Sequence, residues 1–79
     1  MNGEKMTKTL EDQLKDYPVA LDPSQVAEIL GISRRYVDTL LDDGKMAYFI
    51  IDETKKQQQK RVLKAVLIAF IVQQNKINV

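Results

Sequence analysis

The sequence predicts a mainly α-helical domain with three to four short helices and a small β-hairpin. Residues 23–44 carry apolar side chains at helical spacing on both sides of Gly31. Residues 45–51, KMAYFII, are rich in β-branched and aromatic residues, which favours a strand. Residues 65–72 form an uninterrupted apolar run, which favours a buried helix over a surface helix with a single apolar stripe.

The first part of the chain, residues 1–20, is predicted to be an N-terminal tail with one short helix. We expect residues 1–7 to be disordered and Thr9 to cap a helix over residues 10–17. Pro18 is expected to end that helix, because a residue before proline avoids the helical region.

A short extended segment is expected at residues 19–21, followed by two helices joined by a tight turn. Asp22 is suited to cap the first helix, with Pro23 at the first helical position, where its missing N–H is not needed. Gly31 is expected to end this helix in a left-handed conformation that glycine adopts easily.

The second helix of the pair is predicted over Arg34–Asp43, with Ser33 as its cap and Gly44 closing it. Its inward face is formed by three residues at i, i+3 and i+4: Val37, Leu40 and Leu41.

After Gly44 the pattern predicts a strand at residues 45–51, a polar turn at 52–58 and a returning strand at 59–63. Three side chains of the first strand are expected in the core of this hairpin: Met46, Tyr48 and Phe49. A competing interpretation makes residues 53–75 one long helix, because KKQQQKRVLKA has high helix propensity.

The last helix is predicted over Lys64–Gln74. It is apolar almost all round, so most of its sides must be covered. The cover is expected to come from the two-helix unit together with Leu10 and Leu14, or from another subunit.

The composition excludes several classes of function. The chain has 79 residues, enough for one small domain, and it contains no Cys and no His. Thiolate or imidazole metal sites and Cys or His catalysis are therefore excluded, and no Gly-rich phosphate loop is present. We expect no enzyme activity and no cofactor. No signal peptide is visible, and the apolar run is far shorter than the roughly 20 residues that span a bilayer, so a cytoplasmic protein without membrane contact is expected.

The charge is unevenly distributed although the net charge is only +1. Residues 55–79 carry six cationic side chains and no acidic one, whereas residues 21–54 have a net charge of −4. A basic end indicates either a footprint for an anionic partner or a solvated basic surface.

Residues 23–44 fit a DNA-binding helix-turn-helix. Ala27, Gly31 and Val37 stand where such a unit needs a small residue, a turn glycine and a buried β-branched residue.

The chain resembles the excisionase-like family of small winged helix-turn-helix domains, related to the DNA-binding heads of mercury-resistance-type regulators. The family run Leu-Thr/Ser-Pro-x-x-Ala-Ala-x-x-Leu-Gly-Val-Ser is matched by LDPSQVAEILGIS at residues 21–33, and Arg-x-x-Val-x-x-Leu-x-x-x-Gly by RRYVDTLLDDG at 34–44. Arg61-Val62 is similar to the Arg-Ile pair of the second wing strand. The resemblance covers about residues 21–71, and a winged helix-turn-helix DNA-binding domain is expected over residues 21–76. The chain departs from the family in lacking a glycine at the wing bend and in its more apolar last helix.

The resemblance places the second helix in the major groove of DNA. The candidate DNA-binding residues of this helix are Ser33, Arg34, Arg35, Tyr36, Asp38 and Thr39. Those of the wing, which would contact the backbone or the minor groove, are Lys55, Lys56, Lys60 and Arg61.

Each group has a structural alternative. Arg34 or Arg35 can pair with Asp38 along the helix, Tyr36 can belong to the core, and the wing cations can form a solubilising surface.

The resemblance implies a sequence-specific double-stranded DNA-binding protein of a mobile element, an excisionase or recombination directionality factor. Such a protein is nucleoid-associated and bacterial, phage-encoded or plasmid-encoded. Its partners would be DNA and an integrase or another recombination or transfer protein, with a homodimer or a cooperative oligomer forming on DNA. Two alternatives are a small transcriptional regulator or plasmid accessory factor, and a protein–protein interaction module that uses the apolar last helix.

Overall fold

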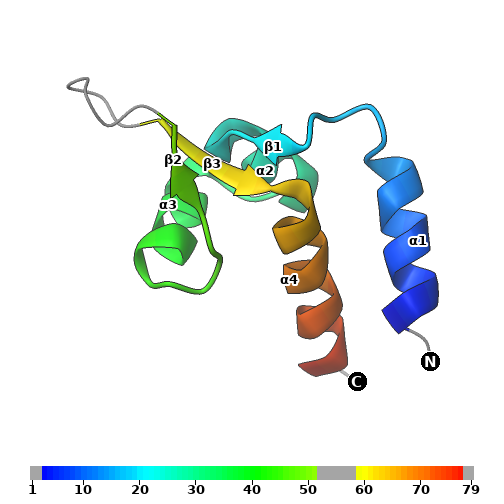
Figure 1. Ribbon diagram of the computed structural model, residues 1–79. Coiled ribbons are helices and arrows are strands. Elements are labelled where there is room, and N and C mark those ends of the chain that lie inside the picture. The colour runs from blue at the N-terminus through cyan, green and yellow to red at the C-terminus, as the bar shows by residue number, and fades with distance from the viewer. Residues whose placement is uncertain (1–2, 52–58, 78–79) are drawn as a thin grey trace.

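The computed structural model describes residues 3–51 and 59–77 of the protein, with side chains from residue 7 to residue 74. The described part is mainly helical and carries a small antiparallel sheet (Figure 1). In chain order the elements are α1 (Gly3–Gln13), β1 (Ala20–Leu21), α2 (Pro23–Leu30), α3 (Arg34–Asp42), β2 (Phe49–Ile50), β3 (Lys60–Leu63) and α4 (Lys64–Ile77).

The start and end of α2 are fixed by local residues, as the sequence predicts. The Asp22 side chain accepts a hydrogen bond from the Gln25 backbone N–H at 2.9 Å, and the Gln25 side chain accepts one from the Asp22 N–H at 3.0 Å. This reciprocal pair satisfies two N–H groups that a helix start leaves without partners. Gly31 ends α2 with φ of 70° and donates its N–H to Ala27 O.

Ser33 caps α3 by accepting a hydrogen bond from the Tyr36 N–H at 3.1 Å. The helix ends one residue earlier than expected, with Asp43 as its C-terminal cap. Gly44 follows with φ of 74°, the left-handed conformation that closes a helix.

The strand expected at residues 45–51 is shorter than predicted, because the chain first completes a turn. The Lys45 N–H bonds back to Leu40 O at 3.0 Å, and Met46 is buried beneath this turn. Only Phe49–Ile50 then pairs as β2. Tyr48 and Phe49, expected in the hairpin core, are 39% and 41% exposed, because two-residue β2 lies at the edge of the sheet.

The sheet has the order β1-β3-β2, so the predicted hairpin gains a third strand from the extended segment before α2. Leu21 pairs with Val62, and both side chains are fully buried on the face that covers α2 and α3. The returning strand is confirmed at Lys60–Leu63, so the alternative of one long helix over 53–75 is wrong. The turn expected at residues 52–58 lies outside the described residues.

The core lies between the inner face of the sheet and the helices. Nine buried apolar residues form it, with contributions from β1, α2, α3, the turn after α3, β3 and α4: Leu21, Val26, Ala27, Val37, Leu40, Leu41, Met46, Val62 and Leu67.

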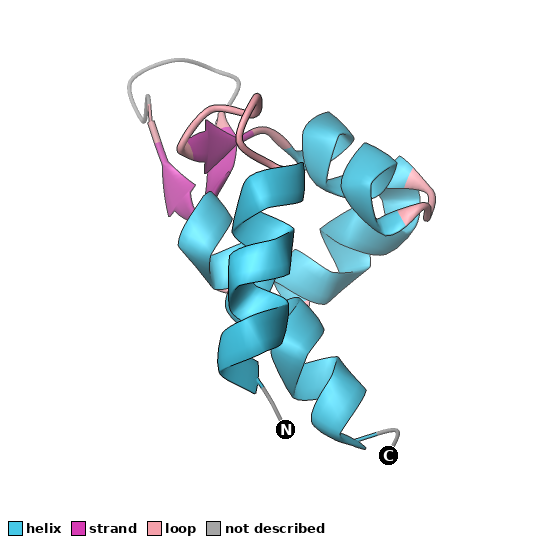
Figure 2. Ribbon diagram, turned by 90° about the vertical axis from the view of Figure 1, so that its right-hand side faces the viewer, coloured by secondary structure: helices cyan, strands magenta, loops and turns pink. Residues whose placement is uncertain are grey.

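Helices α1 and α4 lie side by side and antiparallel at one side of the molecule (Figures 1 and 2). Leu67 on α4 is fully buried, and Ile68 and Leu14 are 6% exposed. The two-helix unit and the N-terminal segment of the same chain therefore cover α4, which is one of the two alternatives expected.

The expectations for residues 1–20 were wrong in detail. The helix begins at Gly3, inside the segment expected to be disordered, and it ends at Gln13 rather than at Pro18. Lys64 binds the backbone that follows the helix: its ammonium donates hydrogen bonds to Leu14 O at 3.0 Å and to Tyr17 O at 2.8 Å. A cation on carbonyls that follow a helix satisfies acceptors left without intrahelical partners.

A second polar contact links this segment to α2. The Tyr17 hydroxyl donates a hydrogen bond to Glu28 Oε1 at 3.0 Å. This bond, together with desolvation and the Glu28 charge, raises the pKa of Tyr17, because the neutral hydroxyl is the donor.

Replacing Lys64 by Met is expected to lower the free energy of unfolding by about 1–2 kcal/mol, since two partly buried carbonyls lose a charged donor. Denaturant titration measures the change. Lys45→Met, which removes an exposed cation that has no side-chain partner among the described residues, is the matched control. Equal effects of the two changes would contradict the capping role.

Replacing Leu67 by Ala is expected to cost about 2–5 kcal/mol of stability through the cavity it leaves. Leu63→Ala, which removes a side chain that is 41% exposed, should cost less than about 1 kcal/mol.

Because α1 and the core cover α4 within one chain, the midpoint of wild-type unfolding should not change with protein concentration. A midpoint that rises with concentration would show that a second subunit supplies part of the cover.

Candidate nucleic-acid interface

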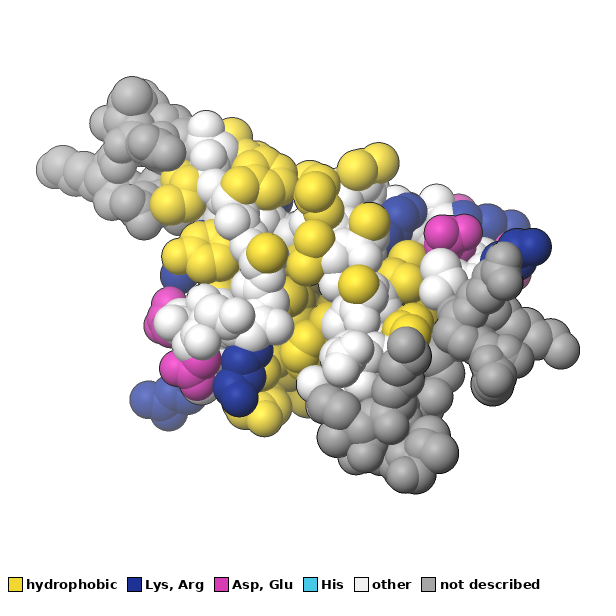
Figure 3. Space-filling view, turned by 60° about the horizontal axis from the view of Figure 1, so that its bottom comes forward, with side chains coloured by type: hydrophobic (Ala, Val, Ile, Leu, Met, Phe, Trp, Pro, Cys, Tyr) yellow, Lys and Arg dark blue, Asp and Glu magenta, His cyan; other side chains and the backbone are white. Residues whose placement is uncertain are grey.

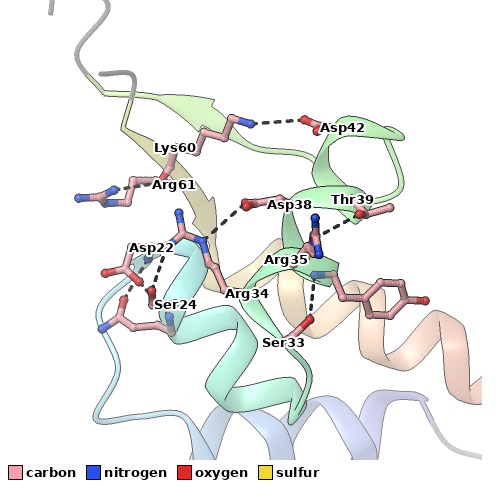
Figure 4. Close-up of polar contacts among 12 residues, drawn as sticks. Asp22, Ser24, Ser33, Arg34, Arg35, Asp38, Thr39, Asp42, Lys60 and Arg61 are labelled. Atoms are coloured by element: carbon pink, nitrogen blue, oxygen red, sulfur yellow. Dashed lines mark hydrogen bonds and ion pairs between the residues drawn. The ribbon is translucent and has the colours of Figure 1, made fainter. Parts of the chain in front are cut away.

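The start of α2, the exposed side of α3 and strand β3 meet around an open hollow of about 480 Å³ (Figure 4). The two helices approach there because the sheet and both helices share one core. The residues that line the hollow are mostly polar or charged: Asp22, Pro23, Ser24, Arg34, Asp38, Asp42, Gln59, Lys60 and Arg61.

The hollow is electrostatically balanced. Three carboxylates, Asp22, Asp38 and Asp42, stand opposite three cations. A surface with both signs of charge attracts a polyanion less strongly than a uniformly basic one. The described residues therefore favour contacts at defined positions over a general electrostatic attraction.

The side chain of Arg34, the first residue of α3, lies between α2 and the second turn of α3. Its Nη1 donates a hydrogen bond to Ser24 Oγ at 3.1 Å, and its Nε lies 3.6 Å from Asp38 Oδ1. The pairing of Arg34 with Asp38, one of the alternatives expected from the sequence, is therefore present. Both side chains remain accessible, at 56% and 44% exposure, so this ion pair contributes little to stability.

Arg35 and Thr39 are exposed on the same helix. The Thr39 hydroxyl donates to Arg35 O at 3.2 Å, which is a common contact of threonine with the preceding helical turn. The Arg35 guanidinium makes no hydrogen bond or ion pair with other described residues, so it is available to a ligand.

Ser33 and Tyr36 stand at the beginning of α3. The Ser33 oxygen accepts the cap bond, while its hydroxyl proton remains free to be donated. Tyr36 is 54% exposed, so the alternative that placed it in the core is wrong.

Lys60 and Arg61 come from β3, and both are engaged within the protein. The Lys60 ammonium lies 3.4 Å from Asp42 Oδ1 and 5.1 Å from the centre of the Tyr48 ring. Lys60 thus joins the hairpin to α3. Arg61 donates to Lys60 O at 2.9 Å and extends away from α3 in Figure 4. The other two wing residues expected in the site, Lys55 and Lys56, lie outside the described residues.

The hollow contains residues that the sequence patterns did not point to. Ser24 and Asp42 line it and contact the predicted site residues Arg34 and Lys60. Tyr48 lies outside the hollow and contacts Lys60 through its ring. The contacts of Ser24 and Asp42 each join different elements of the fold. Ser24 and Arg34 are separated by ten positions, for which no helical or strand spacing gives a signal.

The described part of the chain contains neither a metal-binding cluster of side chains nor a helix suited to span a membrane. There, no group of three or more acidic side chains is placed to hold a metal ion. Within the same ranges, none of the helices has both the length and the apolar character that crossing a bilayer requires.

Comparison with known proteins agrees with this geometry. A family model described as a helix-turn-helix domain matches residues 20–75, from β1 into α4. The match includes all the elements that line the hollow and leaves out α1. No curated protein and no solved structure matches the chain significantly.

Replacing Ser33 by Ala is expected to lower the free energy of unfolding by about 1 kcal/mol, because the first turn of α3 loses its cap. Ser33→Asp keeps an oxygen acceptor at the cap and should retain most of the stability. Denaturant titration of both variants tests the assignment. It would be wrong if Ser33→Asp destabilised the protein as much as Ser33→Ala.

Proposed function

The chain belongs to the helix-turn-helix domain family, whose members bind DNA, and we propose that it is a sequence-specific double-stranded DNA-binding protein in which α3 enters the major groove. An α-helix with its side chains is about 10–12 Å wide and fits a groove of about 12 Å. Helix-turn-helix proteins place the second helix of the unit there, with its N-terminal residues at the base edges.

The observation that carries this proposal is the exposure of Arg34 and Arg35 at the start of α3, beside the hollow that β3 borders (Figure 4). Arginine can donate two hydrogen bonds to O6 and N7 of guanine and can also bind phosphate. The free Ser33 proton and the Tyr36 hydroxyl are suited to phosphate oxygens at the groove edge. Asp38 and Thr39 are within the same helical surface.

The hairpin is proposed to act as a wing on the DNA backbone or in the minor groove. Arg61 extends away from α3. The sequence contains two further cations, Lys55 and Lys56, after residue 51 and before residue 60. Lys60 is engaged by Asp42, so in this proposal it fixes the wing beside α3 as well as adding positive charge.

Within DNA binding, the role we propose is that of an excisionase-like recombination directionality factor. The runs at residues 21–33 and 34–44 and the strand pair that follows them support this role. Its partner would be an integrase or another recombination or transfer protein. A small transcriptional regulator or plasmid accessory factor is the alternative. An integrase gene beside this one, or bending of the bound DNA, would support the first role. A toxin or transfer operon beside it would support the second.

A groove beside α4 favours a candidate function of another class, a protein–protein interaction module (Figure 3). It has a volume of about 540 Å³ and is mainly apolar. It is lined by Lys45, Met46, Ala47, Val66, Ala69, Phe70, Gln73 and Gln74. It shares no residue with the hollow beside α3, so a protein contact here is compatible with DNA binding. A homodimer or a cooperative oligomer on DNA is one form of such contact.

The double substitution Arg34→Ala/Arg35→Ala is expected to weaken binding to a selected duplex by about 30-fold or more. Two base-reading or phosphate-binding side chains are then missing, and one good arginine–guanine pair is worth about 1–3 kcal/mol. Fluorescence anisotropy at two salt concentrations, with duplexes from the gene's own neighbourhood, measures the loss.

The control is Lys8→Ala/Lys15→Ala, which removes the same charge from exposed positions in or just after α1. It should change affinity far less, because neither lysine lies beside the proposed interface. Absence of wild-type binding to every duplex at low salt would refute DNA binding and direct attention to the groove beside α4.

A further inference from the structure

The Arg34 side chain is held from two sides, by residues of two different helices. Ser24 lies in the first turn of α2 and accepts a hydrogen bond from Nη1 at 3.1 Å. Asp38 lies one turn further along α3, and its carboxylate is 3.6 Å from Nε. The guanidinium therefore points into the space between α2 and α3 (Figure 4).

The two contacts leave most of the guanidinium donors unused. Arginine has five N–H groups in a planar fork. The bond to Ser24 uses one of them, and the distance to Asp38 is that of an ion pair rather than of a hydrogen bond. Nη2 makes no hydrogen bond to any described residue. Because Arg34 also lines the open hollow, these donors remain accessible to a ligand.

The contacts have an orienting effect rather than a large effect on stability. Both members of the ion pair are about half exposed, and exposed pairs on a helix contribute little to folding. A long side chain that is already fixed before binding loses less conformational entropy when it binds, so its affinity for the ligand is higher. A planar fork also reads a base edge only when its plane and direction are right.

We propose that Ser24 and Asp38 are positioning residues, and that together they present the Arg34 guanidinium to a guanine in the major groove. This inference rests on the proposed function. Ser24 needs only its hydroxyl oxygen for this role. Asp38, one helical turn after Arg34 on α3, supplies a negative charge that attracts the Arg34 guanidinium. The ligand feature recognised is the guanine edge with its two acceptors, N7 and O6.

The test begins with selection of bound duplexes from a randomised library by the full chain. Each guanine of the selected site is then replaced, one at a time, by 7-deazaguanine, which lacks the N7 acceptor. The wild type should lose about tenfold in affinity at one such position. Arg34→Ala should bind the parent duplex less tightly and should be indifferent to the replacement.

The decisive variant is Ser24→Ala, which changes no charge. It should reduce the tenfold discrimination to about threefold or less, because a misdirected guanidinium loses part of the paired hydrogen bonding. Ser24→Thr keeps the hydroxyl and should retain the discrimination. In the Arg34→Ala background, Ser24→Ala should have no further effect on it, since the two residues act as one unit.

Asp38→Ala should lower the same discrimination while leaving or raising affinity for unselected DNA, because a negative charge is removed from the interface. Asp43→Ala removes the same charge at the end of α3, where the side chain has no partner among the described residues, and should leave the discrimination unchanged.

The outcomes separate the two levels of the proposal. If the library yields no preferred sequence, the proposed function fails, and the positioning role fails with it. If a sequence is selected and Arg34→Ala abolishes the 7-deazaguanine effect while Ser24→Ala leaves it intact, only the positioning role is overturned. The positioning role is also overturned if Ser24→Ala changes the discrimination against 7-deazaguanine equally in the wild type and in the Arg34→Ala variant. Ser24 would then have a merely structural role.

Discussion

The arrangement of the whole molecule depends on strand β3, the middle strand of the sheet. It pairs with β1 on one side and β2 on the other, and its fully buried Val62 lies in the core with α2 and α3. The strand also places Lys60 beside Asp42 at the end of α3, and it continues directly into α4. Because one short strand makes all these connections, β2, the two-helix unit and α4 are fixed relative to one another.

This constraint also accounts for the attachment of α1. Lys64, the first residue of α4, follows β3 without a loop, and its ammonium binds carbonyls just after α1. Its backbone N–H bonds to Val19 O at 2.7 Å, beside β1. The segment outside the family match is therefore held by the residue at which sheet and helix meet, and α1 covers one side of the apolar α4.

Much of the two-helix unit could be predicted because its signals are local. Asp22, Pro23, Gly31 and Ser33 each act on the backbone within four residues, so their roles follow from the sequence alone. The attachment of the backbone after α1 could not be predicted, since it involves Lys64, about 50 positions away. The shortness of β2 and the contact of Ser24 with Arg34 likewise depend on how separate elements pack.

The central claim is that DNA contacts the start of α2, the exposed side of α3 and strand β3. The most direct test is to follow backbone amide resonances by NMR while a short duplex of mixed sequence is added. The account predicts that the largest changes fall near Ser24, at Arg34–Thr39 and at Lys60–Arg61. Changes concentrated instead at Lys45–Ala47 and along α4, with α3 unaffected, would contradict it and assign the binding to the apolar groove.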